Sequence, residues 1–161
     1  MKKVISIIMG SQSDLETLQE AINTLREFKV GFEVKVLSAH RTPKELVKYV
    51  KLAPKKGTKV FIAAAGGAAA LAGVIAAHTT LPVIGIPIET KSLWGLDSLL
   101  STVQMPAGIP VASMGIGKSG AKNAALFALE ILGATEKKIQ AKLARYKARM
   151  RLEIKKIKIK V

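Results

Sequence analysis

Two neighbouring residues, His40 and Arg41, have side chains suited to acid–base chemistry beside a bound anion. An imidazole can donate and accept a proton near neutral pH, as general acid–base catalysis requires. A guanidinium can hold an anion through two parallel hydrogen bonds. The pair therefore predicts a proton carrier next to an anion site. The alternative is a histidine that only bonds to the backbone of a turn.

A second segment, Gly10–Asp14, combines a glycine with two hydroxyls and a carboxylate. A helix that begins here would offer a phosphate its free N–H groups and the positive end of its dipole. Ser11 and Ser13 could add hydroxyl donors, and Asp14 could accept a hydrogen bond from a ribose hydroxyl. The same residue types are typical of ordinary helix capping, which is the competing interpretation. The glycine spacing of Walker and dinucleotide-binding loops is missing.

A third segment, Ala63–Gly73, contains only alanine and glycine apart from Leu71. Residues this small let a backbone come close to a ligand or to another subunit. Close packing of a helix on a sheet explains the composition equally well. His78 follows this segment, and we expect it to interact with the C-terminal end of a helix and not to act as a catalyst.

Hydrophobic patterns predict the elements that position these segments. Short apolar or alternating runs predict five strands, at Val4–Met9, Phe32–Leu37, Val60–Ala64, Val83–Ile86 and Pro110–Gly115. Helical patterns lie between them, over residues 14–28, 43–55, from the turn at 66–67 to 78, 98–102, 121–132 and from 135 onward. Thr42 and Pro43 predict an N-cap followed by a proline at the first helical position, and Glu45 is spaced to complete a capping box.

Strands that alternate with helices predict an α/β fold, in which a parallel five-stranded sheet lies between two layers of helices. Ligands of such sheets bind at the carboxyl ends of the strands, near the switch in strand order. The three segments follow the first three strands, so we expect them to meet at one edge. We expect a single domain over residues 1–161, in which residues 135–161 form a basic C-terminal helix and tail.

Composition excludes several classes of protein. With 49% hydrophobic and 23% charged residues, the chain is not a disordered one. Cysteine is absent and there are only two histidines, so we expect no thiolate chemistry and no metal site. No apolar run is long enough to predict a membrane helix. The apolar run Val4–Ile8 is too short for a signal peptide, so we expect a cytoplasmic protein.

The charge is concentrated toward the C-terminus. The net charge is +15, and residues 135–161 hold 11 basic and only 2 acidic residues. Such a field can attract nucleic acid or an acidic membrane. The segment lacks interleaved aromatic residues and any nucleic-acid-binding motif, which favours a solvated helix face.

Four segments resemble the PurE family, the N5-carboxyaminoimidazole ribonucleotide mutases of purine biosynthesis. They are Met9–Asp14, Ser38–Pro43, Ala65–Ala69 and Gly95–Pro106. The resemblance covers roughly residues 3–150 and leaves residues 152–161 outside it. It implies a flavodoxin-like three-layer αβα sandwich, assembled as a homo-octamer or larger particle with active sites between subunits.

The resemblance also implies the chemistry. The substrate would be an aminoimidazole ribonucleotide, with no metal or other cofactor. Its carboxyl group would move from the exocyclic nitrogen to ring carbon four by decarboxylation and recarboxylation; animal-type relatives instead carboxylate the ring directly. His40 would be the catalytic proton carrier. The implied substrate-binding residues are Ser11, Ser13, Asp14, Ser38, Arg41, Gly66, Gly67 and Leu71.

The third segment departs from the family pattern, which typically reads Ala-Gly-Gly-Ala-Ala-His-Leu-Pro-Gly. Ala70 stands at the histidine position and Ala72 at the proline position, while Ala64 replaces a frequent glycine. The loop thereby lacks an imidazole donor and a residue with a fixed φ. Its backbone N–H groups could still meet a carboxylate or carbon dioxide.

Three functional hypotheses follow. The first is the mutase. The second is a divergent or engineered scaffold of the same family, with weak or no activity, that assembles into a symmetric oligomer or cage. The third is nucleic-acid association through the basic tail.

Overall fold

The structure is a computed structural model that describes residues 2–159. It divides into two compact units, one ending at Ala128 and the other beginning at Leu129. The first unit contains the sheet and the three segments singled out above.

Five parallel strands form the sheet of the first unit. They are β1 (Ile5–Met9), β2 (Phe32–Val36), β3 (Val60–Ala65), β4 (Val83–Pro87) and β5 (Ala112–Ser113). Their order is β2-β1-β3-β4-β5, and every neighbouring pair is parallel. All residues of β1 and β4 are buried, as expected of strands covered on both faces. The predicted parallel five-stranded sheet is confirmed.

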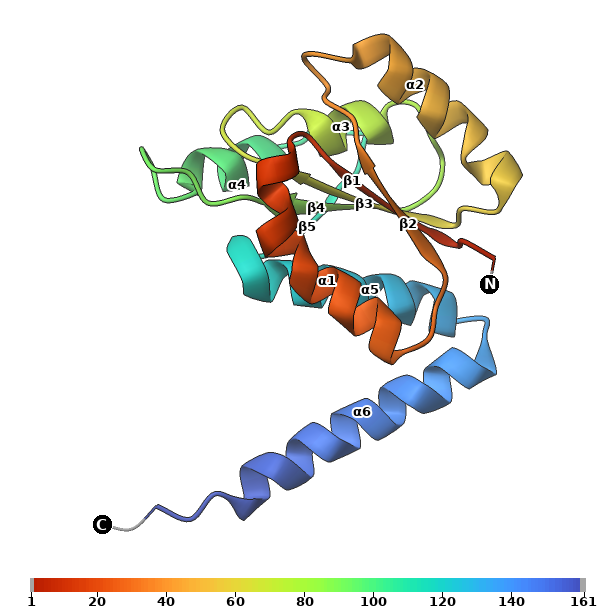
Figure 1. The fold of residues 1–161 in the computed structure, drawn as a ribbon, viewed down its shortest axis with the longest axis vertical. Helices are drawn as coiled ribbons and strands as arrows, with labels where there is room; N and C mark the ends of the chain where they lie inside the picture. Colours follow the sequence, from red (N-terminus) through yellow and green to blue (C-terminus); the bar gives the residue numbers. More distant parts are fainter. Residues whose placement is uncertain (1, 160–161) are drawn as a thin grey trace. The chain divides into compact units, whose positions relative to one another are not determined.

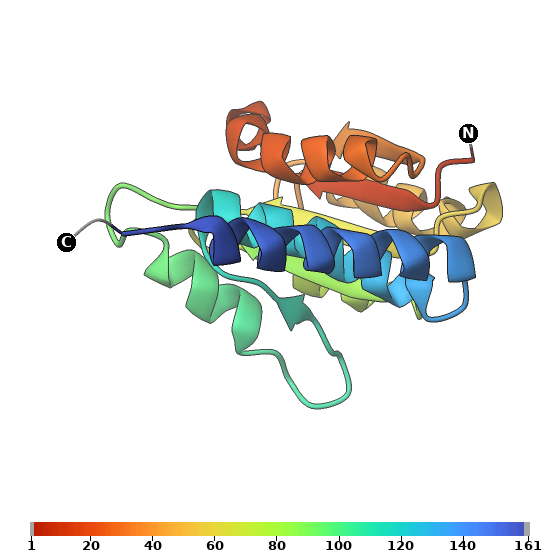
Figure 2. The same cartoon turned by 90° about the horizontal axis from the view of Figure 1, so that it is seen from below.

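The helices of the chain are α1 (Leu15–Glu27), α2 (Pro43–Leu52), α3 (Leu71–Ala76), α4 (Leu96–Val103), α5 (Gly117–Gly133) and α6 (Lys137–Lys156), with 3-10 turns at Gln12–Asp14 and Pro54–Lys56. Those of the first unit cover both faces of the sheet. Figure 1 shows α1 and the first part of α5 on one face, and α2 and α3 on the other. The connection from α4 to β5 loops outward (Figure 2). This is the three-layer arrangement that the alternation of elements predicts.

Helix α4 packs closely on the sheet because β4 contains a glycine. A Cβ atom at Gly85 would collide with the Cγ2 atom of Thr102 on α4 and crowd the Cβ atom of Ala72 on α3, at 3.3 Å. The glycine therefore lets both helices approach the strand. This close approach becomes important for the loop that precedes α3.

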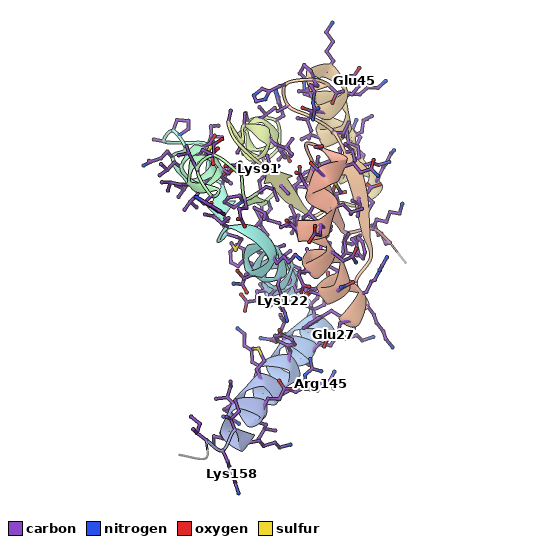
Figure 3. All side chains as sticks on the ribbon, turned by 60° about the vertical axis from the view of Figure 1, so that its left-hand side comes forward. Glu27, Glu45, Lys91, Lys122, Arg145 and Lys158 are labelled. Carbon is purple, nitrogen blue, oxygen red and sulfur yellow. The ribbon has the colours of Figure 1, made fainter. Side chains whose placement is uncertain are left out.

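Some predicted boundaries are wrong. The fifth strand is limited to two residues, between the proline and the glycine that bound the predicted run. The capping box at Thr42 does not form, because its hydroxyl turns back to Ser38, accepting from the N–H at 2.8 Å and donating to the carbonyl oxygen at 3.1 Å. Glu45 is exposed near the start of α2 (Figure 3). Pro43 does occupy the first helical position.

The second unit consists of the end of α5, helix α6 and the residues that follow it. The apolar residues Ile139, Leu143 and Tyr146 of α6 are buried, and Lys147 pairs with Glu130 at 2.6 Å. Most of the other residues of the helix are exposed and many are basic, as Arg145 illustrates, and the tail residue Lys158 is also exposed (Figure 3). Among the residues described, no helix combines the length and the apolar character needed to cross a bilayer.

Candidate active site

The strand order places the switch point of the sheet between β1 and β3. From β1 the chain moves to β2 on one side, and it then returns to β3 on the other side. The connections that leave the carboxyl ends of β1 and β3 therefore diverge and leave a crevice between them. The Gly10–Asp14 turn, the Ser38–Pro43 turn and the loop after β3 surround this crevice. We call residues Gly66–Ala70 the glycine loop.

A pocket of about 410 Å³ occupies this crevice. Seven of the nine predicted site residues line it: Ser11, Asp14, Ser38, His40, Arg41, Gly66 and Leu71. Ala70, which stands where the family pattern has histidine, also lines the pocket. The structure thus brings together residues from three connections that are distant in the sequence.

The Gly10–Asp14 turn forms a capping box at the pocket. The backbone N–H of Ser11 donates to Oδ2 of Asp14 at 3.2 Å, while Oγ of Ser11 accepts from the N–H of Ser13 at 3.4 Å. The capping interpretation of this segment is therefore correct. It is compatible with ligand binding, because Ser11 and Asp14 both cap the turn and face the pocket.

Asp14 is buried, and burial raises the pKa of its carboxyl above the ordinary value of 3.8. Hydrogen bonds from the Ser11 N–H and the Ser13 hydroxyl, and the charge of Arg41, lower the pKa but do not offset the burial. A raised pKa means that ionisation of this carboxyl costs folding free energy. Burial in the site therefore disfavours the charged form of Asp14.

We expect Asp14→Asn to raise the free energy of unfolding at neutral pH. The amide oxygen can still accept from the Ser11 N–H, but the buried charge is gone. The advantage should shrink as the pH falls through the raised pKa of Asp14 and disappear well below the ordinary value of 3.8, where the wild-type carboxyl is protonated in both the folded and the unfolded chains. Thermal unfolding of both proteins from neutral pH down into the acid range measures the difference. A difference in melting temperature that does not depend on pH would contradict the attribution of this cost to the Asp14 carboxylate.

Arg41 bonds to the turn after β1 and to the turn after β2. Its Nη2 donates to the carbonyl oxygen of Gly10 at 2.8 Å, and its backbone N–H donates to Oγ of Ser38 at 3.2 Å. A guanidinium has five N–H donors. Arg41 can therefore hold the turn after β1 in place and still bind an anion.

His40 lies at the rim of the pocket and is exposed. It sits in the turn that ends with the bond from the Thr42 N–H to the Ser38 carbonyl oxygen, at 3.0 Å. An exposed imidazole on a pocket wall can reach a bound ligand and exchange protons with it. The geometry is therefore compatible with the predicted proton carrier.

Two predicted site residues lie outside the pocket lining. Ser13 donates to Oγ of Ser11 at 3.0 Å and lines a neighbouring cavity that shares Asp14 and Gly66 with the pocket. Gly67 donates its N–H to Oγ of Ser98 at 2.9 Å. This is one of the loop N–H groups that could have met a carboxylate or carbon dioxide, and it is bonded within the protein instead.

Sequence reasoning missed Ser98 and also Ser101, whose hydroxyl donates to the carbonyl oxygen of Ala68 at 2.7 Å. Their spacing of three residues in a predicted helix was the available signal, because it places both hydroxyls on one side of the helix. Within the residues described, no group of three or more His, Asp or Glu side chains is arranged to hold a metal ion.

Comparison with known proteins identifies the family. A sequence profile described as AIR carboxylase matches residues 4–153. The chain belongs to the AIR carboxylase family. The resemblance to PurE proteins is thereby confirmed, and the residues from Ile154 onward lie beyond the matched region.

Individual members of the AIR carboxylase family are closely similar to this chain in sequence. An N5-carboxyaminoimidazole ribonucleotide mutase of Pyrococcus abyssi is 56% identical over 147 residues, which cover 91% of this chain and 83% of the relative. The Bacillus subtilis protein of the same name is 54% identical over 89% of this chain and 88% of its own length. The crystal structure of Treponema denticola PurE superposes with a TM-score of 0.86 at 27% identity and covers 94% of each chain.

Proposed function

We propose that this protein is an N5-carboxyaminoimidazole ribonucleotide mutase of purine biosynthesis. The observation that carries the proposal is the pocket at the switch point, where His40 and Arg41 face Ser11 and Asp14 in a chain about half identical to proteins of that name. Neither a scaffold without activity nor a nucleic-acid-binding function finds support in these relatives.

In this proposal the loops after β1 and β2 hold the ribose phosphate part of the substrate. Arg41 binds the phosphate, together with the hydroxyls of Ser11 and Ser38, and Asp14 accepts from a ribose hydroxyl. The side chains are preorganised by the capping box and by the bond from Arg41 to Gly10. The imidazole ring of the substrate then extends toward His40 and the glycine loop, where Gly66 and Leu71 complete the pocket.

His40 serves first as an acid and then as a base. The protonated imidazole gives its proton to the carbamate nitrogen, and the bond from that nitrogen to the carboxyl carbon breaks to release carbon dioxide. Ring carbon four attacks the carbon dioxide held in the pocket, and a carbon–carbon bond forms. The neutral imidazole then removes the proton from carbon four and ends protonated, as it began. One group can do both because an imidazole changes charge near neutral pH.

We also propose that the protein works in the cytoplasm as a homo-oligomer, most simply an octamer. Leu96, Leu100 and Val103 form an apolar stripe along α4, and each is about half exposed. Trp94, which precedes the helix, is 75% exposed. A contiguous apolar surface of this kind is typical of a subunit interface. Light scattering tests the proposal, because a stable monomer of 17.2 kDa would contradict it.

Turnover with two substrates tests the proposed reaction. Purified protein should convert N5-carboxyaminoimidazole ribonucleotide to the product carboxylated at ring carbon four, without any added cofactor. The uncarboxylated ribonucleotide with bicarbonate should be a poor substrate. The reverse preference would assign direct carboxylation instead, and no turnover of either substrate would reject the mutase.

A further inference from the structure

The glycine loop needs an external constraint to keep its shape. Gly67 has a φ of +66°, in the left-handed region, and the loop around it consists of glycine and alanine. Small side chains give a loop little packing of its own, and glycine leaves it many alternative conformations. Yet Gly66 and Ala70 line the pocket, so their positions determine its shape on this side.

Helix α4 supplies two hydrogen bonds to this loop. Oγ of Ser98 accepts from the Gly67 N–H at 2.9 Å, and Oγ of Ser101 donates to the Ala68 carbonyl oxygen at 2.7 Å. The two serines lie three residues apart on one side of the helix. Consecutive residues of the loop are thus held by consecutive turns of the same helix.

Helix α4 is itself fixed to the sheet. The Ser98 hydroxyl is fully buried and donates to the Ile88 carbonyl oxygen at 2.7 Å, just after β4. Thr90, in the same connection, donates to Oδ1 of Asp97 at 2.8 Å. Together with the close approach of Thr102 to Gly85, these bonds make α4 a rigid support.

From this geometry we infer that Ser98 and Ser101 are positioning residues of the active site, which act by holding the glycine loop in its reactive conformation. The inference rests on the proposed mutase function. Neither serine lines the pocket, so they act through the loop and not on the substrate. Losing either bond should misplace the pocket wall, and misplacements of about 1 Å can cost roughly 100-fold in rate.

The experiment combines kinetics with hydrogen exchange in the full-length protein. Ser98→Ala and Ser101→Ala should each lower kcat, by roughly 10- to 100-fold, with a smaller change in KM. Both should speed amide exchange in the glycine loop. Ser101→Thr keeps the hydroxyl at an exposed position and should retain the wild-type kcat and exchange rate.

Ser113→Ala is the matched control. The Ser113 hydroxyl is buried and has no hydrogen-bond partner among the described residues, so its removal should change neither kcat nor loop exchange. If Ser98→Ala does not fold, Ser101→Ala and Ser101→Thr decide. An unchanged kcat or unchanged exchange in Ser98→Ala and Ser101→Ala would overturn the inference. If the wild-type protein turns over neither substrate, but Ser98→Ala and Ser101→Ala still exchange faster than it does, the proposed function is rejected while the loop contact stands.

Discussion

His40→Asn should lower turnover by at least about 100-fold, because general acid–base catalysis contributes roughly 10²- to 10⁴-fold. Asparagine can still donate a hydrogen bond from the wall of the pocket, but it cannot carry a proton between the carbamate nitrogen and ring carbon four. Substrate affinity should stay within about tenfold, since the proposed phosphate contacts come from Ser11, Ser38 and Arg41. Steady-state kinetics and calorimetric titration with the product would measure the two effects separately.

His78→Asn is the matched control for this experiment. His78 is also exposed, but it follows α3 and does not line the pocket. Its replacement should leave turnover unchanged. A His40→Asn protein that keeps more than a tenth of the wild-type rate would remove His40 from the role of proton carrier.

Ala70→His should raise turnover. Ala70 lines the pocket and precedes the first residue of α3, so a longer side chain there can extend toward the ligand. One added donor at a developing charge contributes about 2–4 kcal/mol, or roughly 30- to 1000-fold in rate. Wild-type turnover is accordingly expected to be low for a mutase of this family.

Ala72→Pro should add to this gain. Ala72 lies in the first turn of α3, where a backbone N–H has no partner within the helix and proline is tolerated. The fixed φ should reduce the freedom of the chain just after the glycine loop. The matched control is Ala77→His, at an exposed position just after α3 and outside the pocket lining, which should leave turnover unchanged. Unchanged or lower rates in the single and double variants, with folding intact by circular dichroism, would show that position 70 does not limit the reaction.

The layered fold could be predicted because its signals are local. The buried strands are continuous apolar runs, and α1 carries its buried residues Leu18, Ile22 and Leu25 at helical spacing. The meeting of three distant connections at one pocket followed from the topology of a parallel sheet alone. These features depend on the period and order of residues, which the sequence contains directly.

The details that could not be predicted depend on competition between partners. Thr42 and Ser11 are both hydroxyl residues before a helical turn, yet only Ser11 forms its capping box, because the Thr42 hydroxyl finds Ser38 instead. Likewise, the resemblance implied that Gly67 binds the substrate, but Gly67 donates its N–H to Oγ of Ser98. Local spacing does not show which of two chemically equivalent partners lies nearer after folding.

The two sides of α4 have a thermodynamic consequence. One side holds the glycine loop through Ser98 and Ser101, and the apolar stripe of Leu96, Leu100 and Val103 lies exposed along the helix. In an assembly in which a second subunit covers this stripe, the free energies of subunit association and of loop ordering are coupled through one rigid element. Coupling of this kind is reciprocal: a ligand that binds the ordered loop strengthens association, and dissociation weakens ligand binding by the same factor. The fraction of catalytically competent protein and the fraction of assembled protein would then depend on the same coupled equilibrium.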